Sequence, residues 1–231
     1  MRAHLRCAVA ALVGLVATAA LAQTPPCTAD ARVAQGDADA RPERVLLDPA
    51  WRLPIGYAPT DLVPVAAAGF AEELLVRALL LDDLRALRTA AEADGVQLAV
   101  QSAYRSEAYQ ERVHAGWVRQ LGAARAADVS ARPSHSEHQL GTAIDLRSAG
   151  GPPPWDLEDW STTPEGAWIA EHAHRFGFVI SYPRDARDVT CYAFEPWHLR
   201  WVGRDTAALV RASGLAYRAW LYLNDPPSEA P

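Results

Sequence analysis

The sequence predicts an α+β domain in which a mainly antiparallel sheet is flanked by helices. Segments with helical periodicity alternate along the chain with short strand-like segments. These segments lack the regular βαβ spacing that is typical of a doubly wound parallel sheet. About 200 residues follow an apolar N-terminus, which is enough for one domain with a substantial core.

The N-terminus predicts export. A short basic start precedes an almost entirely apolar run, residues 7–21, and the sequence "ALA" ends at Ala22. This order is typical of a signal peptide, which we assign to residues 1–22. A retained anchor is the alternative, but the run is shorter than the roughly 20 residues that span a bilayer, and no later segment approaches that length. We expect an exported protein, periplasmic or secreted, with no membrane span once the signal is removed.

Composition divides the rest of the chain. Residues 23–45 are rich in Ala, Pro, Asp and Arg without apolar periodicity, which is typical of a leader or a loosely docked arm. Apolar density rises after this segment, so the folded domain is assigned to residues 46–222. Residues 223–231 are expected to form a flexible tail.

The first expected helix covers residues 71–94. Apolar residues recur there at helical spacing, at Leu80, Leu84, Leu87 and Ala91. Gly95 stands where a C-terminal cap belongs. The next segment, residues 96–102, alternates as a strand does.

The remaining elements are marked mainly by their ends. A second helix is expected after Ser106, with one face formed by Tyr109, Val113 and Trp117. A third helix lies between Thr163, a candidate N-cap, and Gly177, which stands just beyond its end. Residues 178–182 follow as a short strand, and residues 205–223 are expected to be helical in pieces.

The charge pattern argues against nucleic acid as a partner. The formal net charge is -6, every basic side chain is Arg, and no basic run is present. An anionic substrate would therefore be held by a few placed arginines rather than by a broad positive field.

Two cysteines remain after the signal peptide, which contains Cys7, is removed. They are Cys27 and Cys191. In an oxidising compartment a pair of cysteines favours one disulfide. Two separate thiols are the alternative.

A first candidate site segment is "SEHQLGTAIDL", residues 136–146. His138 and Asp145 are seven residues apart, and Gly141 gives the backbone freedom to turn between them. "TAIDL" has strand character, so Asp145 is expected on a pleat and His138 in the preceding loop. A loop histidine taken alone is more often solvated or hydrogen-bonded than metal-bound. The neighbouring His135 is expected at the rim of such a site rather than on the metal.

A second candidate segment carries Glu195 and His198, three residues apart in a strand-like run. A regular strand would send residues at odd spacing to opposite faces. Pro196 cannot donate a ladder hydrogen bond, so it implies an edge or a bulge that turns both side chains to one side. An exposed Glu and a core His packed against Trp197 is the simpler interpretation of this segment alone.

Together the two segments supply two imidazoles, one carboxylate ligand and one spare carboxylate. Three protein ligands leave a zinc ion one open position for water, as catalytic sites require. The spare carboxylate is the group that a hydrolase needs to take a proton from that water.

Three motifs resemble a known enzyme family. "SAYRSEAYQ", "SEHQLGTAIDL" and "EPWHLRWVG", in this order and spacing, are similar to the VanY-type D-alanyl-D-alanine carboxypeptidases of metallopeptidase family M15. The similarity takes in "LPIGYAPTDLVPV" and "RFGFVISYP" as well, and so covers roughly residues 46–222. It implies the zinc-bearing α+β fold that this family shares with the Hedgehog signalling domain.

The resemblance also implies site roles. One Zn2+ ion would be bound by His138, Asp145 and His198, with Glu195 as catalytic base. Arg105 would contact the substrate, near the scissile carbonyl or its terminal carboxylate. The other residues expected to contact the substrate are Ser136, Gln110 and Trp197.

Two positions depart from the family pattern. The family usually has a Pro-Gly pair ahead of its Ser-x-His motif, where this chain has Pro133 and Ser134. A Gly is common in the approach to the last motif, where this chain has Cys191. Neither position is an expected ligand.

The expected function is that of a zinc-dependent D,D-carboxypeptidase that removes the C-terminal D-Ala from peptidoglycan stem peptides. The nearest alternatives are an L,D-carboxypeptidase or a peptidoglycan endopeptidase of the same family. A zinc-binding module without activity is the alternative from another class, because fold analogy alone is a weak guide to function.

Overall fold

The structure is a computed structural model that describes residues 24–226 except for 29, 31, 35 and 36. The expected signal peptide, residues 1–22, lies outside the described residues, as does the end of the expected tail, residues 227–231. No helix in the described part of the chain is long and apolar enough to cross a membrane.

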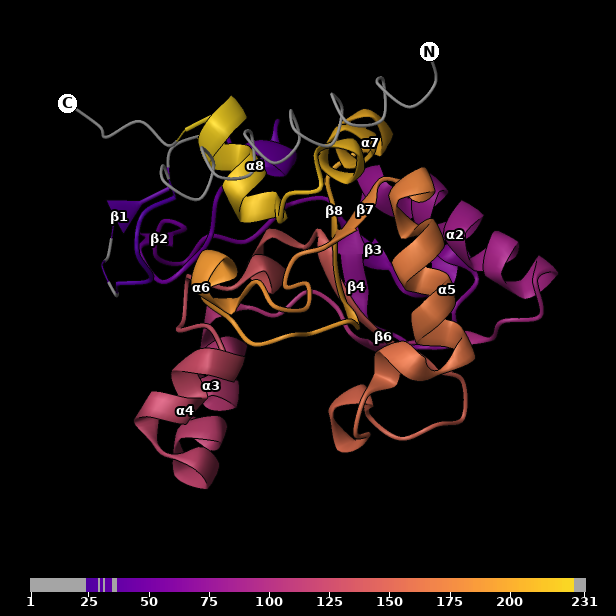
Figure 1. The fold of residues 1–231 in the computed structure, drawn as a ribbon, viewed down its shortest axis with the longest axis horizontal. Coiled ribbons are helices and arrows are strands. Elements are labelled where there is room, and N and C mark those ends of the chain that lie inside the picture. Colours follow the sequence, from indigo (N-terminus) through magenta and orange to yellow (C-terminus); the bar gives the residue numbers. More distant parts are fainter. Residues whose placement is uncertain (1–23, 29, 31, 35–36, 227–231) are drawn as a thin grey trace, which may run out of the picture.

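The central feature is a four-stranded sheet with the strand order β5-β6-β8-β7. Its strands are β5 (Leu98–Ser102), β6 (Ala143–Ser148), β8 (His198–Trp201) and β7 (Phe178–Ile180). Every neighbouring pair is antiparallel. The predicted α+β class with an antiparallel sheet is therefore confirmed (Figure 1).

The two faces of the sheet carry different chemistry. Ile144, Leu146 and Leu199 lie on one face, in the main core. That core also contains apolar residues of helices α2 (Leu81–Ala93) and α5 (Pro164–His172). Because side chains alternate along a strand, the residues between them point to the other face. Those residues include Asp145, His198 and Arg200, all of which are buried.

The helix expected over residues 71–94 begins only at Leu81, so that prediction was wrong in its first ten residues. Instead, β4 (Leu75–Arg77) pairs with β3 (Leu62–Pro64). A 3-10 turn, Ala78–Leu80, connects it to the helix. The periodicity of a short apolar run does not distinguish a strand from a helix. Here the pairing with β3 makes residues 75–77 a strand. The later part is confirmed, with Leu84, Leu87 and Ala91 fully buried.

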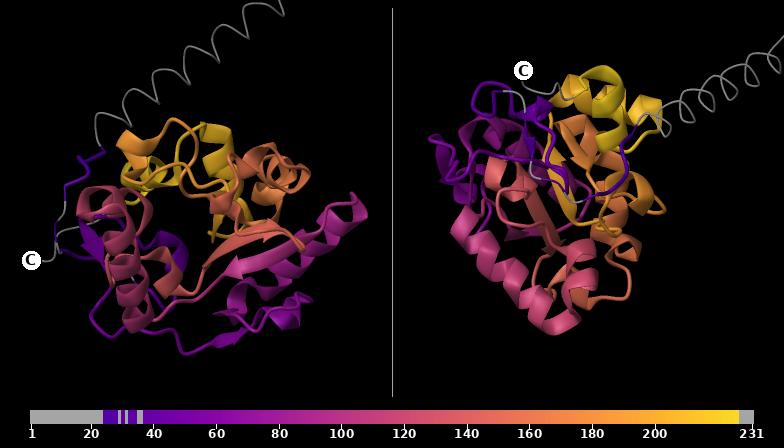
Figure 2. Two further views of the ribbon diagram at one scale, coloured as in Figure 1. Left: turned by 90° about the horizontal axis from the view of Figure 1, so that it is seen from below. Right: turned by 90° about the vertical axis from the view of Figure 1, so that its left-hand side faces the viewer.

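The other helices begin and end close to the expected residues. Helix α3 (Glu107–Leu121) starts after Ser106, whose hydroxyl accepts a hydrogen bond from the Tyr109 amide. Thr163 caps α5 in the same way, and Gly177 ends the following 3-10 turn with a φ of 81°. The remaining helices are short: α4 (Ala123–Val129), α6 (Arg187–Thr190), α7 (Arg204–Ser213) and α8 (Tyr217–Asn224). In Figure 1 and in the right-hand view of Figure 2, the α3–α4 pair lies on the opposite side of the molecule from α7 and α8.

Residues ahead of position 46 are attached more closely than a loose arm would be. β1 (Arg32–Val33) pairs with β2 (Trp51–Arg52) in a parallel ladder. Val45 is buried, and the buried Arg200 donates hydrogen bonds to the carbonyls of Pro42 and Val45. Backbone carbonyls accept hydrogen bonds whatever the side chain of the residue. Attachment through them therefore leaves no apolar periodicity in the sequence.

A disulfide joins Cys27 in the N-terminal segment to Cys191 at the end of α6. Cys191 has a φ of 72°, in the left-handed region that favours glycine. Glycine adopts this conformation most easily, which explains why the family pattern has a Gly where this chain has Cys191.

Candidate metal centre

The register of the sheet brings Asp145 and His198 together. Asp145 on β6 is directly opposite His198 on β8, and its partner on β5 is Ser102. Opposed residues on antiparallel strands have their Cβ atoms about 5 Å apart on the same face. The His198 Nδ1 atom consequently lies 3.0 Å from Asp145 Oδ1.

His138 reaches the same point from the turn ahead of β6. It lies in a 3-10 turn, Glu137–Leu140, that is capped by the Ser136 hydroxyl. Gly141 then adopts a φ of 73°, and a Cβ atom there would lie only 2.8 Å from Arg77 Cγ. This sharp reversal leaves His138 Nε2 3.3 Å from Asp145 Oδ2.

One ligand atom from each of His138, Asp145 and His198 lies within 4.8 Å of the others, and all three residues are buried. His138 Nδ1 is 2.7 Å from the carbonyl of Ala103, which only accepts hydrogen bonds, so this nitrogen carries the proton and Nε2 presents its lone pair. His198 Nε2 is similarly placed, 3.0 Å from a carboxylate oxygen of Glu137. Its Nδ1 faces the cluster.

The donor set fits zinc. Two imidazole nitrogens and one carboxylate oxygen are ligands that zinc accepts, and three protein ligands leave a fourth position open. A hard cation such as Ca2+ would need six to eight oxygen ligands. One zinc ion is the cofactor that this cluster fits.

The charges around the cluster follow from burial and from the hydrogen bonds. Burial lowers the pKa of His138 to about 4, and the nearby Arg105 adds to this shift. Burial alone would lower the pKa of His198, but its hydrogen bonds to Asp145 and Glu137 raise it to about 10. Without a metal, His198 therefore carries a proton on both nitrogens, and binding of a metal ion at Nδ1 must release one of them.

Glu195 lies beside the cluster, with Oε2 3.9 Å from His198 Nδ1. Burial raises the pKa of its carboxyl to about 8, although the charge of His198 opposes this shift. Pro196 lies ahead of β8, which is an inner strand of the sheet, so the edge or bulge expected at Pro196 is not found in the described residues. The His198 amide instead donates to the Glu195 carbonyl, at 3.1 Å. Residues 195–198 thus form a turn, and Pro196 occupies its second position, where turns favour proline.

Arg105 follows β5 and is held at the edge of the cluster. Its Nε donates to Gln110 Oε1 at 2.8 Å, and its Nη1 donates to the Ser102 hydroxyl at 2.8 Å. Nη1 also lies 3.6 Å from Asp145 Oδ2. No hydrogen bond in the described part of the chain uses Nη2, so this nitrogen can still donate to a ligand.

A cavity of about 480 Å³ opens over the cluster. Of the residues expected to contact the substrate, it is lined by Arg105, Ser136 and Trp197. Gln110 does not line it: this side chain is fully buried and lies beneath Arg105. Tyr109, Val113 and Trp117 of α3 line the cavity and are not core residues. His135 is also outside the lining, and its Nδ1 lies 2.7 Å from the Asp48 carbonyl.

Sequence reasoning missed several residues next to His198. Tyr182 stacks on its ring, with ring centroids 4.8 Å apart. Glu137 and Arg200 form a buried ion pair with an Oε1 to Nη1 distance of 2.7 Å. One feature of the sequence indicates this ion pair: residues 198 and 200 of a strand share a face, so Arg200 is expected on the same buried face as His198. A buried Arg there requires a carboxylate partner.

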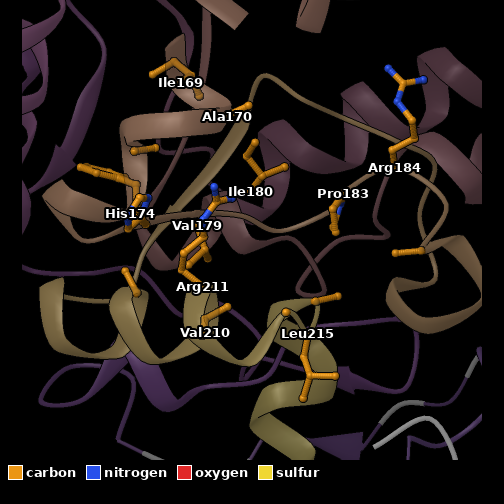
Figure 3. Close-up of a pocket in the computed structure, with 16 residues that line it drawn as sticks. Ile169, Ala170, His174, Val179, Ile180, Pro183, Arg184, Val210, Arg211 and Leu215 are labelled. Carbon is orange, nitrogen blue, oxygen red and sulfur yellow. The ribbon is translucent and has the colours of Figure 1, made fainter. Parts of the chain in front are cut away.

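A second cavity of about 340 Å³ lies beyond the edge strand β7 (Figure 3). Ile180, Val210 and Leu215 form part of its apolar wall, and His174 and Arg211 also line it. It shares no lining residue with the cavity over the metal cluster.

Comparison with known families decides the assignment. The family model described as "VanY: D-alanyl-D-alanine carboxypeptidase" matches residues 73–204, a range that contains all three candidate metal ligands. The chain belongs to this VanY family.

Two relatives extend the VanY match in sequence. The YodJ protein of Bacillus subtilis is 35% identical over 181 residues, which are 75% of this chain and 66% of that protein. A D-alanyl-D-alanine carboxypeptidase of Enterococcus faecalis is 34% identical over 148 residues, which are 60% of this chain and 52% of that enzyme. The chain thus spans less than two thirds of the length of these relatives.

Solved structures of the VanY type share the fold. VanYB in complex with D-Ala-D-Ala has a TM-score of 0.68 at 27% identity, over 79% of this chain and 99% of VanYB. The LD-carboxypeptidase LdcB has a TM-score of 0.67 at 33% identity, over 76% of this chain and 83% of LdcB. A mutant VanY D,D-pentapeptidase in complex with Zn(II) has a TM-score of 0.66 at 27% identity, over 78% of this chain and 98% of that one. These comparisons support an enzyme of the metallopeptidase class.

Proposed function

We propose that the protein is an exported zinc D,D-carboxypeptidase that removes the C-terminal D-Ala from peptidoglycan stem peptides. The observation that carries the proposal is Glu195, whose carboxyl is only 16% exposed and lies beside three candidate ligands that it is not needed to complete. A site that only stored zinc would have no use for this group.

We assign the metal to His138, Asp145 and His198. Zinc bound there supplies Lewis-acid polarisation of a carbonyl and lowers the pKa of a water molecule to about 7. Glu195 accepts the proton of the attacking water at its carboxylate and delivers it to the leaving amine. Its raised pKa suits both steps, because the group exchanges a proton readily near neutral pH.

Arg105 is proposed to anchor the substrate. It lines the cavity, and its guanidinium is fixed by Gln110 and Ser102. A guanidinium held in this way can bind a terminal carboxylate or a developing oxyanion with little loss of freedom. Ser136 and Trp197 are proposed to contact the substrate from the cavity wall.

Export is proposed from two features. The N-terminal segment has the order of a signal peptide. The disulfide between Cys27 and Cys191 is of a kind that persists in oxidising compartments. Peptidoglycan lies on that side of the membrane.

An L,D-carboxypeptidase is the second candidate, and a specific observation favours it. Two of the solved structures with this fold are LD-carboxypeptidases: LdcB, and DacB of Streptococcus pneumoniae with 30% identity and a TM-score of 0.57. Both activities use the same metal chemistry and differ in the residues that flank the cleaved bond.

Defined muropeptides analysed by mass spectrometry test the proposal. We expect a pentapeptide stem to lose one terminal D-Ala, and a C-terminal amide to slow this reaction because Arg105 then has no carboxylate to bind. Loss of a residue only from tetrapeptide stems would support the L,D alternative. Products cut within the stem would indicate an endopeptidase.

Two variants serve as matched controls in this assay. Glu195→Gln should keep its zinc and lose activity by about 10²–10⁴-fold, the usual contribution of a general base. His198→Ala should lose affinity for zinc itself. Full activity in Glu195→Gln would contradict the mechanism, and loss of zinc from Glu195→Gln but not from His198→Ala would reverse the assigned roles.

A further inference from the structure

Glu137 is a buried carboxylate that the proposed reaction does not use. It lies between Ser136 and His138 in the chain, and its carboxylate approaches the Nε2 atom of the His198 ring. Oε2 lies 3.0 Å from His198 Nε2 and accepts a hydrogen bond from the Ser181 hydroxyl at 2.6 Å. Oε1 accepts from Arg200 Nη1 at 2.7 Å.

Arg200 is itself held firmly. Its side chain is 0% exposed, and Nη2 donates to the carbonyls of Pro42 and Val45 at 2.7 and 2.6 Å. Its guanidinium also lies over the ring of Tyr217, 5.1 Å from the centroid. The N-terminal segment, Arg200, Glu137 and His198 thus form one continuous chain of contacts.

We propose that Glu137 is a positioning residue: it keeps the proton of His198 on Nε2 and so directs the lone pair of Nδ1 at the metal. Neutral imidazole has one donor nitrogen and one acceptor nitrogen. A carboxylate only accepts, so the nitrogen that faces Glu137 must be the donor. The other nitrogen, Nδ1, lies 3.0 Å from Asp145 Oδ1 and donates to it in the metal-free protein. A metal ion bound by Asp145 and Nδ1 would displace this proton, and the proton that faces Glu137 would stay.

The polarity of the three contacts makes the carboxylate hard to replace. Arg200, Ser181 and His198 all present donors to Glu137. A glutamine has one acceptor oxygen, which must face Arg200, because a guanidinium does not lose its proton. The amide NH2 of that glutamine then faces His198 Nε2. The ring responds by moving its proton to Nδ1, which can no longer bind the metal.

The inference rests on the ligand set assigned under the proposed function but not on which peptide bond is cleaved. The readouts are therefore zinc affinity and ring protonation, which remain measurable if the protein cleaves no stem peptide. Partners of metal-bound histidines typically change metal affinity by 10–100-fold when they are replaced.

The first measurement uses the zinc-loaded wild-type protein. We expect the 15N chemical shifts of His198 to show Nδ1 bound to the metal and Nε2 protonated. Binding through Nε2, with the proton on Nδ1, would overturn the proposal. This measurement requires no substitution, so it cannot fail because a variant does not fold.

The second measurement compares the zinc affinity of variants by chelator competition. Glu137→Gln should bind zinc about 10–100-fold more weakly than the wild type. Ser181→Ala removes one hydrogen bond from the same carboxylate without changing the group that faces His198, and should stay within about threefold. Glu165→Gln, which alters a carboxylate that accepts a hydrogen bond from Ser148 elsewhere, should not change the affinity. Wild-type affinity in Glu137→Gln, or an equal loss in Ser181→Ala, would refute the positioning role.

Discussion

At the scale of one residue, Glu195 contributes to the pH dependence of the stability of the metal-free protein. Burial raises the pKa of its carboxyl from an ordinary 4.5 to about 8. The folded protein therefore binds this proton more tightly than the unfolded chain does. The resulting contribution to stability is fully present below pH 4.5 and is lost as the pH rises through about 8.

Glutamine at this position carries no titrating proton. We expect metal-free Glu195→Gln to match the wild type near pH 4 and to be more stable above pH 8. One pKa unit corresponds to about 1.4 kcal/mol, so the gain is on the order of a few kcal/mol. Urea unfolding in the presence of a chelator at both pH values measures it. A difference between the two proteins that is the same at both pH values would mean that the carboxyl is not perturbed.

At the scale of an element, the turn that links His138 to β6 depends on Gly141. A Cβ atom there would lie 2.8 Å from Arg77 Cγ and 3.2 Å from Leu62 Cδ2. Arg77 cannot move away easily, since its guanidinium is bonded to Asp61 and to the carbonyls of Ala38 and Asp39. The positive φ adds backbone strain for any residue with a Cβ atom.

We expect Gly141→Ala to destabilise the fold by about 1–3 kcal/mol and to weaken zinc binding, because the turn carries a ligand. Gly150→Ala is the matched control, since Gly150 has a φ of 72° but no atom within 4 Å of the added carbon. It should cost only about 1 kcal/mol and leave zinc affinity unchanged. Thermal unfolding and zinc titration distinguish the two. Equal behaviour of both variants would show that the contact with Arg77 does not matter.

At the scale of the whole molecule, the disulfide ties the N-terminal segment to the approach of the last motif. It joins residues 164 positions apart. Arg218 on α8, whose Nε lies 2.7 Å from Asp48 Oδ2, also donates from Nη1 to the carbonyl of Pro25 at 3.2 Å. The N-terminal segment is thus attached both covalently and by hydrogen bonds.

Removal of the disulfide should destabilise the protein by about 2–5 kcal/mol. Cys27→Ser with Cys191→Gly should be more stable than Cys27→Ser with Cys191→Ser by about 1 kcal/mol, because glycine adopts the left-handed backbone of position 191 without strain. Urea unfolding of the two double variants and the oxidised wild type checks both expectations. Two reactive thiols in the native, unreduced protein would show that the bond does not form in solution.

Sequence patterns predicted the features that a few neighbouring residues decide. Thr163 caps its helix as expected, and the helix expected after Ser106 starts there with the Ser106 hydroxyl as its cap, because a cap is a hydrogen bond across three residues. Gly141 uses the freedom to turn that was expected of it, with a φ of 73°. The first helix was overextended because pairing with a distant strand, β3, turns Leu75–Arg77 into β4.

The sequence by itself determined the donor chemistry: two histidines, two acids and an arginine, in motifs whose spacing points to one zinc site. Only the tertiary structure decided that Gln110 supports Arg105 instead of lining the cavity, and that Glu137 and Arg200 meet behind His198. The physical reason is range. Caps and turns are settled by local contacts. The partner of a buried charge, however, is chosen by strand register and by which segments cover it, and here those segments are 63 and 158 residues apart in the chain.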